Sequence, residues 1–112
     1  MAATTIRQLV EAQLLTASAT SALYQAPDST VASIQGATLL NTTAGVVTCT
    51  VYITPKATAP AVQYALVSVN LAAGKSYLCP ELVNQKVTAG HEIHALGDGV
   101  TFAVGGVEIA GQ

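Results

Sequence analysis

The sequence predicts an all-β fold, an antiparallel β-sandwich or jelly-roll-like domain of about eight short strands. Three observations predict it: segments with alternating apolar and polar residues, turn-forming residues between them at intervals of about 8 to 12 residues, and no helical pattern separating the segments. The chain of 112 residues can bury a core of its own, and no repeat or linker divides it. We therefore expect a single β-sandwich domain over residues 1–112.

The clearest strand runs from Val46 to Thr54, where β-branched residues occur with a period of two. Its core-facing residues are expected to be Val47, Cys49, Val51 and Ile53. The turn formers at 41–45 predict a hairpin between this strand and the preceding strand at 31–42, in which Gly36 marks a β-bulge. Two prolines, Pro55 and Pro60, predict a loop before the next strand at 64–71.

The second half of the chain predicts shorter strands. A tight turn at 72–75 leads into a strand at 76–79, and residues 81–85 are expected to form a 3₁₀ turn or irregular backbone. A further strand covers 91–96. Gly97-Asp98-Gly99 then predicts a two-residue hairpin turn, because Asp-Gly tolerates the positive φ values that such a turn requires. The inward row of the returning strand is expected to be Val100, Phe102 and Val104, with Gly105-Gly106 as a kink.

The N-terminal segment fits two structures. Ile6, Leu9, Val10, Gln13 and Leu14 have helical spacing, and Thr5 with Gln8 has the form of a capping box. The alternative is a strand that ends near Thr16. We favour the strand because residues 18–26 have the pattern of its hairpin partner, but residues 6–15 as a helix stay an open alternative.

The composition is poor in charge. Charged residues make up 9% of the chain, its net charge is -2, and the charges are scattered singly, whereas apolar residues make up 51%. Because no basic cluster or basic amphipathic face exists, nucleic acid and membranes are not expected as partners. A surface with so few charges predicts self-association or attachment to another protein. No signal peptide or membrane span is recognisable, so we expect assembly in the cytoplasm.

The pair His91 and His94 is the first candidate for chemistry, with Glu92 between them. Residues three apart on a strand point to opposite faces, so the two imidazoles are not expected to share a metal ion. Asp98 is assigned to the turn, and no third ligand is recognisable. We therefore expect no metal site and no cofactor.

Other catalytic groups are not expected to form an active site. Cys49 and Cys79 lack the spacing of zinc ligands or of a disulfide framework, and we interpret them as small core residues without a nucleophilic role. The carboxylates that would have to converge for acid–base catalysis are Glu11, Asp28, Glu81, Glu92, Asp98 and Glu108. Isolated carboxylates are mostly solvated, so the sequence predicts no enzyme.

The aromatic residues leave a binding role open. They are Tyr24, Tyr52, Tyr64, Tyr77 and Phe102. Exposed rings on a β-sandwich could stack against sugars, but packing in the core and tyrosine hydrogen bonds explain them equally well, and we favour the core.

Several segments along almost the whole chain resemble those of small virion proteins of tailed phages. In the first half these are Ala22-Leu23-Tyr24-Gln25-Ala26-Pro27, the segment from Ile34 to Leu40 with Asn41-Thr42-Thr43, and the strand from Val46 to Ile53. In the second half they are the run from Val69 to Tyr77 with Ala72-Ala73-Gly74-Lys75, then Leu82-Val83, the run from Ala89 to Ala95, and Val104-Gly105-Gly106-Val107-Glu108. Many members have an acidic residue where this chain has His91.

The resemblance implies a β-sandwich or jelly-roll protein displayed on the virion and most similar to the capsid decoration (cement) proteins of short-tailed phages. Such a protein would clamp neighbouring major capsid subunits as a homodimer or homotrimer. The family has no catalytic residues to transfer. Two alternatives stay open, a tail fibre or baseplate adaptor domain and a carbohydrate-binding module for host attachment.

Overall fold

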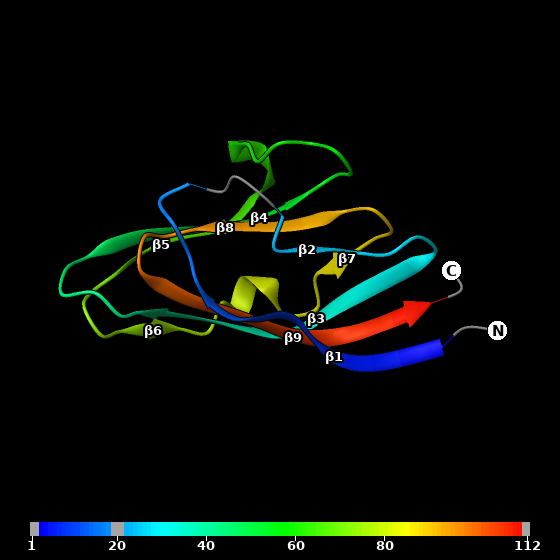
Figure 1. Cartoon of the computed structure of the whole chain (residues 1–112), viewed down its shortest axis with the longest axis horizontal. Coiled ribbons are helices and arrows are strands. Elements are labelled where there is room, and N and C mark those ends of the chain that lie inside the picture. Colours follow the sequence, from blue (N-terminus) through cyan, green and yellow to red (C-terminus); the bar gives the residue numbers. More distant parts are fainter. Residues whose placement is uncertain (1–2, 19–21, 111–112) are drawn as a thin grey trace.

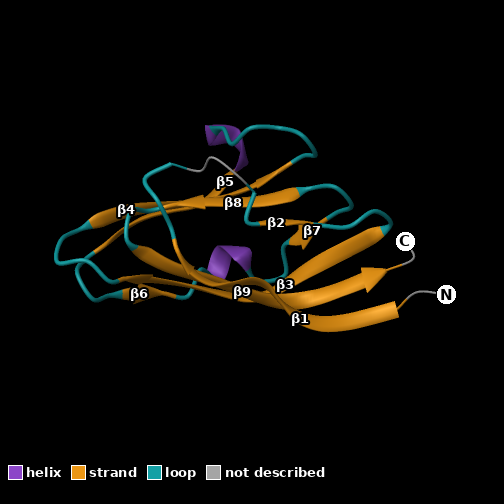
Figure 2. Ribbon diagram, in the orientation of Figure 1, coloured by secondary structure: helices purple, strands orange, loops and turns teal. Residues whose placement is uncertain are grey.

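The protein is an all-β sandwich of two antiparallel sheets, as seen in a computed structural model that describes residues 3–18 and 22–110 (Figures 1 and 2). The first sheet has the strand order β1-β9-β3-β6, and β7 also pairs with β3. Its strands are β1 (Ala3–Leu14), β9 (Val100–Ala110), β3 (Thr30–Asn41), β6 (Ser76–Tyr77) and β7 (Lys86–Val87). The second sheet has the order β2-β8-β4-β5. Its strands are β2 (Tyr24–Gln25), β8 (Glu92–Leu96), β4 (Val47–Thr54) and β5 (Ala65–Leu71).

This strand order confirms the predicted jelly-roll-like sandwich. The chain crosses from one sheet to the other after β1, β2, β3, β5, β7 and β8, so strands that follow one another in sequence mostly lie in opposite layers. Among the described strands, β4 and β5 are the sequence neighbours that pair directly as a hairpin. Two short 3₁₀ helices, η1 (Val62–Tyr64) and η2 (Pro80–Leu82), interrupt the loops. Three strands, β1, β3 and β9, have 12, 12 and 11 residues and run the length of the first sheet, whereas short strands were expected.

The core lies between the two sheets and confirms the predicted alternation. Val100, Phe102 and Val104 of β9 are completely buried and form its centre. From the facing sheet, Cys49 and Val51 of β4 are also fully buried, and Val47 and Ile53 are partly buried against the core. The alternation of β4 breaks at a register shift after Val51, beyond which Thr54 is buried. Small aliphatic side chains fill the space between sheets that pack about 10 Å apart. The sparse aromatic content is therefore compatible with a closed core.

The N-terminal segment is a strand, as favoured. β1 pairs antiparallel with β9 from Ala3 opposite Ala110 to Leu14 opposite Thr101. The register shifts between Gln8 and Val10 and again before Gln13, and these bulges let the adjacent Leu9 and Val10 both enter the core. Two neighbouring buried residues in a bulged strand produce the spacing that also resembles a helix.

The three predicted hairpins are wrong. Residues 31–42 and 46–54 lie in different sheets, because the turn between them crosses the sandwich. The buried Asn41 fixes this crossing: its Nδ2 donates hydrogen bonds to the backbone oxygens of Gly45 at 2.7 Å and Leu71 at 2.8 Å. Asn41 thus satisfies backbone groups that a hairpin ladder would otherwise pair.

The hairpin predicted at Gly97-Asp98-Gly99 is wrong for the same reason. This turn joins β8 of one sheet to β9 of the other. The turn closes with a hydrogen bond of 2.9 Å from Val100 N to Gly97 O, and Gly99 has the positive φ of +82° that was expected. It is held by the backbone of Leu15 and Thr16 rather than by a hairpin ladder. Similarly, the segment 18–26 is not the partner of β1, because β2 pairs with β8; residues 19–21 lie outside the described part.

Other local predictions are confirmed. A β-bulge lies between Ile34 and Gly36, Lys75 N donates to Ala72 O in the tight turn, and the region after Pro80 is a 3₁₀ helix. The glycine pair in β9 allows a close approach of strands. A Cβ on Gly106 would lie 2.4 Å from the backbone oxygen of Ser33, whereas the nearest atom to a Cβ on Gly105 is Gln8 Oε1 at 3.5 Å.

We predict that Gly106→Ala destabilises the protein by about 1–3 kcal/mol, because the neighbouring backbone must move to admit the methyl group. The matched control is Gly105→Ala, which should change the free energy of unfolding by less than about 1 kcal/mol, since its methyl group meets ordinary contacts. Urea unfolding followed by circular dichroism measures both. Equal stability of the two variants would contradict the close packing of β9 on β3.

Candidate interaction surface

The first sheet has one side against the core and one side turned away from the second sheet. The register defines the second side, because its residues alternate with buried ones along each strand. We call these residues the outer face. They are Thr4, Ile6, Gln8 and Leu14 of β1, Thr101, Ala103, Gly105, Val107 and Ile109 of β9, Val31, Ser33, Thr38 and Leu40 of β3, Ser76 of β6, and Lys86 of β7.

The outer face carries few charges. Of the residues just assigned to it, Lys86 at its margin carries the only charge. Its centre consists of small residues such as Ala103 and Gly105, and both ends are apolar. Ile6 at one end is 80% exposed and Leu14 at the other is 63% exposed. Exposed apolar residues gathered on one side of a protein mark a binding surface more often than scattered ones do.

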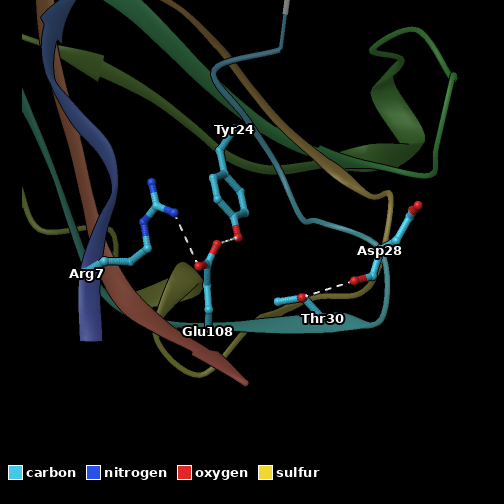
Figure 3. Close-up of polar contacts among 5 residues, drawn as sticks. All are labelled: Arg7, Tyr24, Asp28, Thr30 and Glu108. Carbon is cyan, nitrogen blue, oxygen red and sulfur yellow. Dashed lines mark hydrogen bonds and ion pairs between the residues drawn. The ribbon is translucent and has the colours of Figure 1, made fainter. Parts of the chain in front are cut away.

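Arg7 of β1 and Glu108 of β9 lie on the opposite side of the sheet, whereas the exposed Glu11 lies in the bulge of β1 between Val10 and Gln13. Glu108 of β9 faces the space between the sheets, where its Oε2 accepts a hydrogen bond from the hydroxyl of Tyr24 in β2 (Figure 3). Its Oε1 accepts a hydrogen bond from Arg7 Nη1 of β1 at 3.3 Å. Arg7, Tyr24 and Glu108 therefore join β1, β2 and β9. These contacts tie the two sheets together near the end of the sandwich. Thr30 lies nearby and donates to the backbone oxygen of Asp28 at 3.3 Å.

The ion pair between Arg7 and Glu108 contributes little to the stability of the fold, because the Arg7 side chain is 48% exposed and water screens its charge. The hydrogen bond from Tyr24 is better protected, since the ring is buried. Burial raises the pKa of the Tyr24 hydroxyl above its usual 10.0, and the hydrogen bond to the negatively charged Glu108 raises it further.

We predict that Tyr24→Phe lowers stability by about 1 kcal/mol at neutral pH, because Glu108 loses a buried donor. The folded state holds the Tyr24 proton more tightly than the unfolded chain does. Its stabilising contribution is therefore complete below pH 10.0, the ordinary pKa, and is lost as the pH rises toward the raised value. Urea midpoints measured against pH should decline less steeply above pH 10.0 in the variant. Identical alkaline profiles would contradict this role of Tyr24.

The two histidines make separate contacts, in agreement with the strand argument. His91 precedes β8, and its Nδ1 lies 2.8 Å from Thr88 Oγ1. His94 is 5% exposed, and its Nε2 lies 3.0 Å from Oε1 of Glu92, two residues earlier on the same strand. His94 Nδ1 and the nearby Thr54 Oγ1 are buried without a hydrogen-bond partner among the described residues. Within residues 3–18 and 22–110, no three His, Cys, Asp or Glu side chains gather as metal ligands.

The cysteines are core residues, as predicted. Cys49 and Cys79 are both completely buried and unpaired in the structure. Burial raises the pKa of both thiols, to about 12 for Cys79, where the charges of Glu81 and Cys49 add to the effect. A thiol that stays protonated at neutral pH is a poor nucleophile.

The carboxylates do not converge. Glu92 contacts His94, Glu108 contacts Tyr24 and Arg7, and Glu81 accepts hydrogen bonds from Tyr77. The bond to Glu81 raises the pKa of Tyr77 to about 12. The remaining three, Glu11, Asp28 and Asp98, are exposed at separate places.

The aromatic side chains lie in or against the core. Tyr24 and Phe102 are buried, and Tyr52, Tyr64 and Tyr77 are partly buried. None of the five presents a fully exposed ring for stacking on a sugar.

Sequence reasoning missed the outer face and the group formed by Arg7, Tyr24 and Glu108. The alternation in β9 places its odd-numbered residues on one side of the sheet and its even-numbered residues on the other. This signal is visible in the sequence. Which strands lie beside β9, however, depends on the pairing across the sandwich.

Comparisons with known proteins give one weak structural similarity to report. No family model and no curated protein matches the chain. A solved structure, described as the structure of infectious bursal disease virus Gx strain, shares 17% sequence identity with this chain at a TM-score of 0.37. The similarity covers 96% of this chain and 31% of the virus chain, so this chain spans about a third of that protein's length. A similarity at this level carries no argument about function.

In the described part of the chain, no helix has the length and apolar character needed to cross a membrane.

Proposed function

We propose that this protein is a non-enzymatic structural protein of a virus particle, a bacteriophage capsid decoration (cement) protein that binds neighbouring major capsid subunits. The observation that carries the proposal is the outer face of the first sheet, whose assigned residues include one charge, Lys86 at the margin, and are apolar at both ends. A surface of this kind gains free energy when another protein covers it, because few charges must be desolvated.

The size of the outer face suits a stable contact. The three long strands β1, β9 and β3, spaced about 4.8 Å apart and about 36 Å in length, give an area on the order of 500 Å², to which the two-residue strands β6 and β7 add a margin. Standard interfaces bury about 800 Å² on each partner. One copy of the chain therefore offers more than half of the area that a standard interface buries on one partner.

The fold and the sequence resemblance support the same proposal. Jelly rolls occur repeatedly in viral capsid proteins, although the fold also serves lectins and cupins and does not define a function. The resemblance of the segments from Ala22 to Pro27 and from Val69 to Tyr77 to tailed-phage virion proteins favours the capsid. The protein would then assemble in the host cytoplasm and reside on the capsid surface, with the major capsid protein and further copies of itself as partners.

We predict that Thr38→Lys abolishes binding to capsids. Thr38 is exposed at the centre of the outer face, where it lies opposite Ala103, and a buried unpaired ammonium group there would oppose docking. The matched control is Ser68→Lys, which places the same charge on an exposed position of β5 in the second sheet. Sedimentation with purified phage heads should retain the wild type and Ser68→Lys and lose Thr38→Lys.

Failure of the wild type to sediment with heads would overturn the proposal, as would binding to unassembled capsid subunits with equal affinity. Electron microscopy of virions carrying a labelled copy locates the protein directly. Label over the head is the expected result, and label at the tail would instead identify a fibre or baseplate adaptor. Specific glycan-array binding with no binding to heads would identify a carbohydrate-binding module.

A further inference from the structure

The free edge of β1 is the part of the sandwich that is built to pair with another strand. Within the described residues β1 pairs with β9 on one side, and no strand lies on its other side. Its backbone donors and acceptors on that side therefore form an unused row. Such an edge is a template for a further β-strand.

The edge divides into a regular half and an irregular half. From Thr4 opposite Ile109 to Gln8 opposite Gly105, the pairing with β9 continues without a shift. The two bulges follow between Gln8 and Gln13 and interrupt the ladder. Bulges are one of the devices that prevent pairing at an edge, and they protect only the second half of β1. The regular half contains no proline, glycine or lysine that would block it.

Ile6 lies at the centre of this regular half and is 80% exposed. It is on the outer face, beside Val107 of β9. An isoleucine in this position is covered only slightly by its own fold, but it would be covered by a side chain at the same level of an added strand.

We propose that the protein forms a two-fold symmetric homodimer in which the β1 strands of two copies pair antiparallel over residues 4–8. The two-fold axis passes between the Ile6 residues, so Ile6 faces Ile6, and Thr4 faces Gln8. Thr5 then faces Arg7, and this register brings no like charges directly opposite each other. The segment is thus complementary to itself, which favours a second copy over an unrelated strand.

Pairing at this edge joins the two first sheets into one, so the two outer faces become continuous. The contact is short, about 17 Å of strand, and buries less than a standard interface. In the absence of capsids, the dimer should therefore dissociate and re-form reversibly. Two outer faces held together would bind two neighbouring capsid subunits with increased avidity, and this last step rests on the proposed function.

Cysteine cross-linking tests the register directly. In Ile6→Cys, the two thiols lie opposite each other across the two-fold axis and should form an intermolecular disulfide under mild oxidation. Cys49 and Cys79 are completely buried and do not compete. The matched control is Val62→Cys, at a position in η1 that is 91% exposed. Covalent dimer in Ile6→Cys but not in Val62→Cys is the expected result, and equal cross-linking of both variants would overturn the proposal.

Charge variants test the same contact at equilibrium. Ile6→Lys and Ile6→Glu each place like charges opposite each other and should raise the dissociation constant of the dimer by about tenfold. An equimolar mixture of the two variants should recover the dimer, because unlike charges then meet at the axis. Analytical ultracentrifugation measures all three samples, and circular dichroism confirms their folding.

A monomeric wild type at the highest soluble concentration would overturn the proposal, as would a trimer or a mixture that stays monomeric. These measurements use the free protein without capsids. A failure of dimerisation is therefore distinguishable from a failure of capsid binding.

Discussion

The apolar layer between the two sheets is the contact on which the rest of the structure depends. Because the chain crosses the sandwich at most of its turns, few strands pair with their neighbours in sequence, and neither sheet is assembled from local hairpins alone. Val100, Phe102 and Val104 pack from one side against residues such as Val51 and Cys49 from the other. Their burial supplies the free energy that holds distant strands in register, since the hydrogen bonds between strands exchange for bonds to water with little net gain.

Polar groups at the margins complete this layer and also shape the surface. Asn41 satisfies backbone oxygens where the chain crosses between sheets, and Tyr24 binds Glu108 from the opposite layer. The carboxylate of Glu108 is thereby used inside the sandwich, together with Arg7. The outer face of the same strands is left without those charges. The fold and the proposed docking surface thus follow from a single distribution of charged residues between the two sides of one sheet.

The sequence predicted individual strands well because alternation with a period of two depends on neighbouring residues alone. The inward row of β9, the strand at 47–54 and the bulge at Gly36 are examples. Pairing was predicted poorly, since a turn such as Gly97-Asp98-Gly99 has the same residues whether it joins partners or crosses a sandwich. The separation of His91 from His94 was predicted because it needs only local geometry. The outer face could not be predicted, because it gathers residues from strands that are distant in the sequence.

The pairing of β1 with β9 also sets the order in which the molecule can be completed. Ala3 lies opposite Ala110, so this ladder closes a loop that includes almost the entire chain. During translation, β1 has no partner in its own chain until β9 has left the ribosome. Because the loop closed by the pairing of β1 with β9 is long, its entropic cost delays this pairing even in the finished chain. Folding should therefore be slow for a domain of this size. Throughout that interval the N-terminal segment is an unpaired strand, and chaperones or nascent copies on the same polysome would encounter it first.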